Sequence, residues 1–298
     1  MPDAPIPRKR GNRAGIWFFR TMMRLAGLRG AYGLLYLVCP YYVWFDREAF
    51  ANAAVYLARR FPEHGRRRLR RDVFRLFVEQ GKNLIDRHAM VAGAFDFDLR
   101  IDGYDKMADA LAEGRGCVLL TSHTGNWQAA MSALESLDRT VHLLMRPEDN
   151  AAMRDAMQVD VEKGRIQIIS PDQALGGVVE MMKALEQGDI VSIMGDRTYG
   201  ADGVAVDFMG EPAWFPYSAF LIAASARCPL AIMLSSKTGR YSYSVEIADV
   251  LFPSLDRKGD RKGQLRKWVQ QYADILQSYL AEHPFQYFIF HDIWRDSE

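Results

Sequence analysis

The segment CVLLTSHTGNWQ, residues 117–128, joins an apolar run to a polar turn that contains one histidine and one glycine. A short, continuous apolar run is typical of a strand that is buried on both faces of a parallel sheet. His123 follows this run, and Gly125 and Asn126 belong to the turn that leads into an amphipathic stretch. Because ligands bind at the carboxyl ends of parallel strands, the segment predicts a strand, a turn and a helix with His123 at a functional edge.

The rest of the chain after Gly103 alternates between short apolar or β-branched runs and amphipathic stretches. The predicted strands are CVLLTS (117–122), VHLLM (141–145), IQIIS (166–170), DIVSIM (189–194), LAIMLSS (230–236) and YSYSVEI (241–247). The predicted helices are 126–137, 150–164, 174–187 and 262–282, and a hairpin turn is predicted at Thr238 and Gly239. This alternation indicates the α/β class, with a mostly parallel central sheet flanked by helices.

The region before this sheet is basic, aromatic and helical in pattern. We expect residues 1–95 to form an N-terminal amphipathic helical region, with one helix at 66–92, and residues 96–298 to form a compact α/β domain. The uncharged stretch at 30–45 is too short to span a membrane comfortably, and we expect Pro40 to break it. Its aromatic residues favour a helix that lies in the membrane interface. The alternative is a helical hairpin packed on the protein's own core.

Charge and composition narrow the possible partners. The net charge is only +1, but eight arginines crowd residues 59–75. They lack the interleaved aromatic residues of a nucleic-acid reader, so a membrane headgroup or an acidic carrier protein fits them better. The three cysteines lie far apart, which indicates a reducing compartment. Four further histidines have no ligand spacing with one another, so we predict no metal; they are His88, His142, His283 and His291.

His123 has the position of a general base. The free N–H groups at the start of the following helix favour negative charge, so we expect the pKa of a neutral imidazole there to be lowered. Such a histidine is available as a base near neutral pH. Gln128 lies in the first helical turn, close enough to hydrogen-bond His123. The alternative is a polar capping loop with a half-exposed histidine.

Four blocks of the sequence stand in an order that resembles one protein family. The blocks are HTGNWQ (123–128), MRP (145–147) with Asn150, GDRTYGADGVAVDFMGEPAWFPYSAFLIA (195–223) and HPFQYFIFHDIW (283–294). From about Gly103 onward they make the chain similar to the bacterial lipid A late acyltransferases, within the wider lysophospholipid and glycerol-phosphate acyltransferase superfamily. The family carries Glu or Asp where this chain has Gln128. Glutamine can orient a histidine ring but carries no charge to balance imidazolium, and Asp196, after a later parallel strand, is the natural compensating carboxylate.

The resemblance also implies roles for the other residues of these blocks. His123 would deprotonate the acceptor, and the turn amides at Gly125 and Asn126 would bind substrate and hold the oxyanion. Arg146 and Arg197 follow strands and would clamp a phosphate or the phosphopantetheine of an acyl donor. The alternative for each arginine is an exposed side chain paired with a nearby acid.

The expected function is transfer of a fatty acyl chain from an acyl carrier protein or coenzyme A thioester to a hydroxyl or amine of a membrane lipid or glycolipid. The family resemblance places such an enzyme at the cytoplasmic face of the bacterial inner membrane, with no cofactor and no nucleic-acid partner. Two alternatives stay open. One is a catalytically silent subunit that binds lipid or acyl carrier, and the other is a thioesterase in which water replaces the acceptor.

Overall fold

A computed structural model describes residues 13–112, 114–126, 139–145, 166–172, 174–198, 202–256 and 258–295 of the chain. Two of the predicted site residues, Gln128 and Arg146, lie outside these ranges. The same holds for the bodies of the helices predicted at 126–137 and 150–164.

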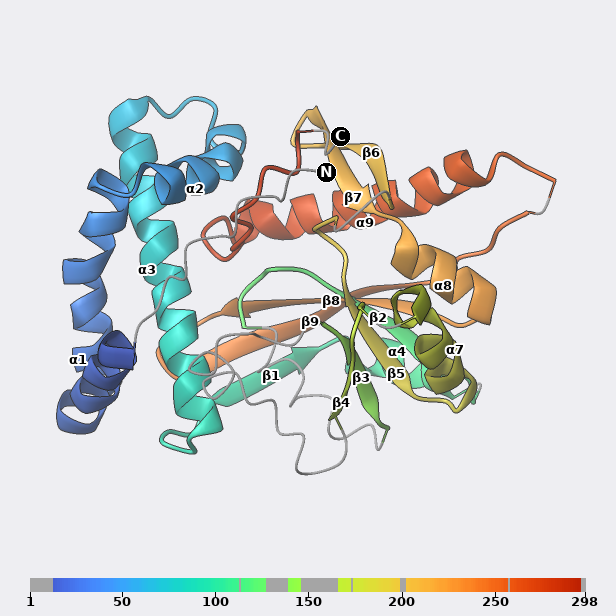
Figure 1. Cartoon of the computed structure of the whole chain (residues 1–298), viewed down its shortest axis with the longest axis horizontal. Coiled ribbons are helices and arrows are strands. Elements are labelled where there is room, and N and C mark those ends of the chain that lie inside the picture. The colour runs from blue at the N-terminus through green and yellow to red at the C-terminus, as the bar shows by residue number, and fades with distance from the viewer. Residues whose placement is uncertain are drawn as a thin grey trace.

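The described part of the chain is built around a mixed, largely parallel sheet of seven strands (Figure 1). In chain order these are β1 (Asp98–Asp102), β2 (Cys117–Thr121), β3 (Val141–Leu144), β4 (Ile166–Ile169), β5 (Ile190–Met194), β8 (Leu230–Lys237) and β9 (Ser242–Leu251). Their spatial order is β1-β9-β8-β2-β5-β3-β4, and β8 with β9 is the antiparallel pair within it. The predicted α/β class and the predicted hairpin are therefore confirmed.

Three strands were not predicted from the sequence. β1 is an edge strand of sequence DLRID with no fully buried residue, so it lacks the apolar signal of its neighbours. β6 (Gly203–Phe208) and β7 (Glu211–Pro216) form a separate two-stranded antiparallel sheet. This hairpin packs against α9, which covers it with apolar side chains.

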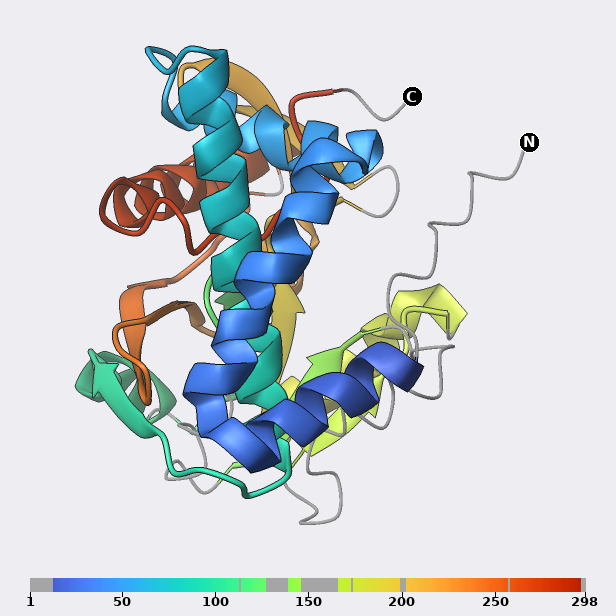
Figure 2. The same ribbon diagram turned by 90° about the vertical axis from the view of Figure 1, so that its left-hand side faces the viewer.

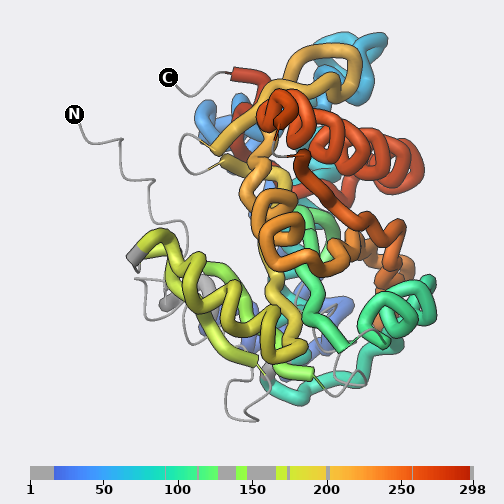
Figure 3. Tube along the Cα trace, turned by 90° about the vertical axis from the view of Figure 1, so that its right-hand side faces the viewer, coloured from blue at the N-terminus to red at the C-terminus, as the bar shows by residue number. Residues whose placement is uncertain are grey.

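Helices cover both faces of the main sheet. In β2, Val118 and Leu120 point into a core shared with α7 (Val178–Glu186), α8 (Ser218–Ala226) and α9 (Arg261–Glu282). Cys117 and Leu119 point to the other face, which α4 (Tyr104–Leu111) covers. A short 3₁₀ turn, η3 (Ala174–Gly177), precedes α7. Seen from the side, α8 lies between α7 and α9, and α4 lies apart from them (Figure 3).

Three N-terminal helices pack against this unit: α1 (Arg13–Trp44), α2 (Arg47–Arg60) and α3 (Arg66–Val91). α1 lies along α3 and bends sharply at Gly27, whose φ of 62° is strained for any other residue (Figure 2). The expectation that Pro40 breaks the apolar stretch is wrong, because α1 continues through Pro40 to Trp44. The neighbouring turns of the helix pack on α2 and α3 and hold it in place.

The two faces of α1 have opposite characters. One face, which includes Leu28, Ala31 and Leu35, is buried in the core that the N-terminal helices share with the sheet. Elsewhere, α1 and the residue that follows it expose a set of large apolar side chains, which we call the apolar face of α1: Trp17, Phe18, Leu25, Tyr36, Leu37, Val38, Tyr41, Trp44 and Phe45. Among the described helices, none is both long enough and apolar enough to cross a membrane.

A buried polar cluster fixes the N-terminal helices to the sheet. Asp86 of α3 is fully buried and accepts hydrogen bonds from the hydroxyls of Tyr32 in α1 and Tyr243 in β9. Lys237 of β8 forms an ion pair with the same carboxylate, with Nζ 2.5 Å from Oδ2. Burial and the negative charge of Asp86 raise the pKa of both tyrosines, so they stay protonated and keep donating. The cluster therefore joins α1, α3, β8 and β9 through one carboxylate.

Candidate active site

His123 and Asp196 meet at the carboxyl end of the sheet because their strands are in register. β2 and β5 are parallel neighbours, with Thr121 opposite Met194, so the residues two positions beyond lie level with each other. The His123 Nδ1 atom is 2.8 Å from Asp196 Oδ1, and the backbone N–H of His123 donates to Asp196 Oδ2 at 2.6 Å. Asp196 is fully buried, whereas 28% of the His123 side chain is exposed. The carboxylate therefore fixes both the ring and the backbone of His123. Of the two ring nitrogens, Nδ1 contacts Asp196 and Nε2 does not.

The expected direction of the His123 pKa shift is wrong. Burial and the positive charge of Arg197 do lower this pKa, but the charge of Asp196 and its hydrogen bond to the ring raise it by more. The net pKa lies above the ordinary value of 6.5. The expectation of a lowered pKa rested on the start of the following helix, which falls partly outside the described residues. It did not include the contact with the buried carboxylate of Asp196.

The turn after His123 is held by the C-terminal segment. The N–H of Gly125 donates to the carbonyl of Gln286 at 2.8 Å, and the N–H of Phe288 donates to the carbonyl of His123 at 2.7 Å. Thr124 pairs with Tyr287 between these bonds, as in an antiparallel bridge. The last sequence block thus lies against the first. The Gly125 amide is thus bonded to the chain itself, and the oxyanion role expected of the turn amides stays a prediction.

Gly125 has a steric reason to be glycine. Its φ is +49°, and a Cβ atom built on it would lie 2.2 Å from the carbonyl oxygen of Ser235 in β8. No side-chain rotation can relieve a collision with backbone. Gly125 therefore lets the turn pass close to β8, and it also lines the cavity described next.

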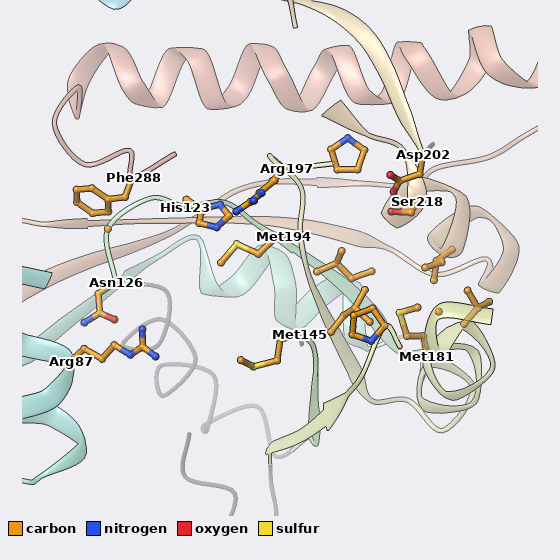
Figure 4. A pocket seen from close by; sticks show the side chains of 18 of the residues that line it. Arg87, His123, Asn126, Met145, Met181, Met194, Arg197, Asp202, Ser218 and Phe288 are labelled. Atoms are coloured by element: carbon orange, nitrogen blue, oxygen red, sulfur yellow. The ribbon is translucent and has the colours of Figure 1, made fainter. Parts of the chain in front are cut away.

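A cavity of about 750 Å³ opens beside His123. On one side of the histidine its wall is polar and comes from α3 and the turn after β2, with Asn83, Arg87 and Asn126. On the other side the wall is mostly apolar, and it is lined by Leu144, Met145, Leu175, Val178, Met181, Ile193, Met194, Pro216 and Ile222. Figure 4 shows His123 and Arg197 next to each other, with Arg87 and Asn126 to one side and Met145 and Met181 to the other. The imidazole therefore stands where a polar and an apolar compartment meet.

Asn126 and Arg197 line this cavity, as the sequence suggested for substrate-binding residues. Sequence reasoning missed Asn83, Arg87 and Phe288, which also line it. Asn83 and Arg87 lie four residues apart, on one face of α3, but the helix carries many other polar residues, so its sequence offers no clear signal for this pair. Burial lowers the pKa of Arg87 to about 10, so its guanidinium stays charged at neutral pH.

Asn83 presents an amide to the cavity. Its Oδ1 contacts the hydroxyl of Tyr243, and its Nδ2 is buried with no hydrogen-bond partner among the described residues. A buried N–H group of this kind is costly unless a ligand or water satisfies it. Within the same described ranges, no group of three or more His, Cys, Asp or Glu side chains is placed to hold a metal ion.

The fold and the His–Asp pair agree with the result of comparison to known families. Residues 62–296 match the model of the bacterial lipid A biosynthesis acyltransferases, and the chain belongs to this family. It is also similar to the phosphatidylinositol mannoside acyltransferase of Mycobacterium tuberculosis H37Rv, with 26% identity over 238 residues, which is 75% of this chain. The protein of the same name from strain CDC 1551 is 26% identical over 232 residues. The match spans 66% of the length of each relative.

Proposed function

We propose that this protein transfers a fatty acyl chain from a thioester donor to a hydroxyl or amine of a membrane glycolipid. The observation that carries the proposal is the His123–Asp196 pair at the junction of the polar and apolar compartments of one cavity. A long acyl chain needs an apolar channel, and a sugar acceptor needs hydrogen-bond donors and acceptors. His123 lies where the thioester carbonyl and the acceptor hydroxyl would meet.

In the proposed mechanism, His123 acts as a general base. Asp196 accepts a hydrogen bond from Nδ1–H and so holds the ring in the tautomer whose Nε2 is basic. Nε2 takes the proton of the acceptor hydroxyl while the oxygen attacks the thioester carbonyl, and a tetrahedral oxyanion forms. Collapse of this intermediate breaks the C–S bond, and the imidazolium returns its proton to the leaving thiolate. Asp196 stabilises the imidazolium between these steps, which is the part that the family's acidic residue would play at Gln128.

Stabilisation of the oxyanion is assigned to Arg197 in this proposal. Its positive charge is close enough to His123 to oppose protonation of the ring, and its guanidinium lies beside the imidazole in Figure 4. A preorganised cation beside the reacting carbonyl lowers the energy of the developing negative charge. Asn126 and the Nδ2 group of Asn83 are further donors in the same wall, and we assign them to the acceptor.

A glycolipid acceptor is supported by two facts. The family acts in lipid A biosynthesis, and the mycobacterial relatives are named as phosphatidylinositol mannoside acyltransferases. The proposed donor is an acyl carrier protein thioester or a coenzyme A thioester. We also propose peripheral association with the cytoplasmic face of the inner membrane. Attachment to a membrane is supported by the apolar face of α1 and by exposed apolar residues at the cavity, Leu84, Leu175 and Val178.

The proposal is tested by a thiol-release assay with acyl-CoA and a lipid extract, followed by analysis of the acylated product. His123→Ala should lower turnover by about 10²–10⁴-fold, the usual contribution of a general base. His64→Ala, at the turn between α2 and α3, is the matched control and should stay near wild type. Thiol release that yields free fatty acid and no acyl lipid would identify a thioesterase instead. No release by the wild type, with acyl-CoA or with an acyl carrier protein thioester as the donor, would favour the catalytically silent subunit.

A further inference from the structure

A second cavity, of about 490 Å³, lies where α1, α3 and the β8–β9 turn meet. We call it the basic cavity, because four of its lining side chains are cationic. Its lining residues are Arg29, Tyr32, Gly33, Tyr36, Glu79, Lys82, Lys237, Thr238, Gly239 and Arg240. No step of the proposed acyl transfer uses it.

The basic cavity has a surplus of positive charge. Lys82 pairs with Glu79, with Nζ 2.7 Å from Oε1, and Lys237 pairs with the buried carboxylate of Asp86. The guanidinium groups of Arg29 and Arg240 remain, and both residues are exposed and have no carboxylate partner in the described part of the chain. Two arginines without a carboxylate partner, one from α1 and one from the β8–β9 turn, are suited to an oxyanion such as a phosphate.

The position of the basic cavity relates it both to the membrane and to the active site. Tyr36 lines it and is also part of the apolar face of α1. Glu79 and Lys82 line it from α3, whereas Asn83 and Arg87 line the active-site cavity from the adjacent face of the same helix. α3 is therefore the shared wall of the two cavities.

We propose that the basic cavity binds the phosphate headgroup of an anionic phospholipid. The inference rests on the proposed membrane association and deepens it. Arg29 and Arg240 hold the phosphodiester from two sides, while the neighbouring apolar face of α1 contacts the acyl region of the same leaflet. Because α3 separates the two cavities rigidly, a headgroup held on one of its faces orients the active-site cavity relative to the bilayer.

The test measures binding to phosphatidylcholine vesicles with and without phosphatidylglycerol. Arg29→Gln with Arg240→Gln should weaken binding to the anionic vesicles by about fivefold per arginine, and binding to phosphatidylcholine should be unchanged. The matched control is Arg261→Gln with Arg266→Gln on α9, two exposed arginines away from α1 (Figure 1). Equal losses in the two double variants would show diffuse surface attraction and would overturn the proposal.

A second variant fills the basic cavity without removing a charge. Gly33 lines it from α1, and a Cβ atom built there meets nothing within 4 Å. Gly33→Gln should therefore fold normally and lower the affinity for anionic vesicles severalfold. Gly65→Gln, at an exposed glycine that is equally open, is the control and should bind as wild type. Wild-type affinity in Gly33→Gln would contradict the proposal.

Two further measurements separate the possible failures. If glycerol phosphate stabilises the wild type but not Gly33→Gln, while both bind vesicles equally, the site takes a soluble phosphate and the lipid assignment is wrong. Leu37→Gln with Trp44→Gln should weaken binding to both kinds of vesicle, since it removes apolar contact only. Acyl transfer to detergent-dispersed acceptor should be unchanged in the basic-cavity variants. A wild type that binds neither vesicle would refute membrane association itself, and this headgroup assignment with it.

Discussion

At the scale of single residues, the site depends on one buried carboxylate that serves two groups of His123. Asp196 accepts from the ring Nδ1 and from the backbone N–H, so it sets both the tautomer and the position of the imidazole. A carboxylate also stabilises imidazolium, which an amide at position 128 cannot do. The raised pKa of His123 is the physical consequence of this contact.

The contact predicts a particular pH dependence. The base must be neutral, so kcat/KM should rise with pH through the raised pKa of His123 and reach its plateau only above 6.5. In Asp196→Asn the attraction that favours imidazolium is lost, so the pKa of His123 should fall. The rising limb of the pH profile should therefore move to lower pH. Turnover on the plateau should fall by about 10³–10⁴-fold, because the amide no longer enforces the tautomer.

A His–Asp pair elsewhere in the same sheet serves as the control for this pH profile. His142 Nε2 lies 3.0 Å from Asp189 Oδ2, at the opposite end of β5 from Asp196. Asp189→Asn should leave the rising limb of the kcat/KM profile at its wild-type pH. If Asp196→Asn left both the limb and the plateau unchanged, Asp196 would have no positioning role, and Gln128→Ala would be the next variant to measure.

Gly125 gives a second prediction at this scale. In Gly125→Ala the left-handed backbone and the collision with the Ser235 carbonyl should together lower the free energy of unfolding by about 3 kcal/mol. Gly210→Ala is the matched control, since Gly210 also has a positive φ, of 80°, but an added Cβ would meet nothing within 4 Å. Gly210→Ala should lower the free energy of unfolding by only about 1 kcal/mol. Urea denaturation measures both, and equal losses would show that the close approach to β8 does not matter.

At the scale of elements, α3 has the central position. One face lines the active-site cavity, the adjacent face lines the basic cavity, and Asp86 fixes the helix to β8 and β9. The helix therefore belongs to the site, although the sequence placed it in the N-terminal amphipathic region and outside the predicted acyltransferase domain. The N-terminal helices are also part of the core. Deletion of residues 1–45 would remove the buried residues Leu28, Ala31 and Leu35, so it is a poor test of membrane binding.

Asp86 should be the most costly ion-pair residue to remove from this helix. Asp86→Ala leaves Lys237 buried without its partner, which typically costs about 3–5 kcal/mol. Asp86→Ala combined with Lys237→Met should cost less than Asp86→Ala alone, because no charge is then left buried. Arg100→Ala, which removes an exposed pair with Asp102, should cost less than about 1 kcal/mol. Chemical denaturation of the four proteins checks the order, and a double variant as unstable as the single one would contradict it.

At the scale of the whole molecule, the active-site cavity lies between the N-terminal helices, the sheet edge and the α7–α8 pair. Its apolar compartment is bounded by Met181 of α7 and Ile222 of α8. In the proposed function, these two helices limit the length of the acyl chain.

A larger residue at this boundary should shorten the accepted chain. In Ile222→Trp, each methylene that no longer fits should lower kcat/KM for the long-chain donor by about fourfold, from about 0.8 kcal/mol per buried methylene. Short-chain donors should react as before. Val179→Trp is the control, because Val179 is exposed on α7 and does not line the cavity. Competition between acyl-CoA donors of different length measures the shift, and an unchanged preference would place the chain elsewhere.

Much of the sheet and one half of the site could be predicted from the sequence. The strands of the sheet's interior are short apolar runs, and burial on both faces makes such runs recognisable without any tertiary information. Helix α3 was predicted at nearly its observed bounds from its periodicity. His123 and Asp196 were predicted to be near each other because both follow parallel strands, and the carboxyl ends of neighbouring strands converge.

The sequence predicted that Asp196 lies near His123, but only the tertiary structure decided how the surrounding groups act on the histidine. The direction of its pKa shift depends on a carboxylate 73 positions away along the chain, and electrostatic attraction acts through space, with no signature in local sequence. The bonding of the Gly125 amide to the C-terminal segment, the entry of Asn83 and Arg87 into the cavity wall and the basic cavity arise in the same way. Sequence periodicity determined which face of each element is buried, because burial of apolar area is a local property of the pattern. Which polar groups then meet depended on how the elements pack, because hydrogen bonds and ion pairs need atoms within a few ångströms of each other.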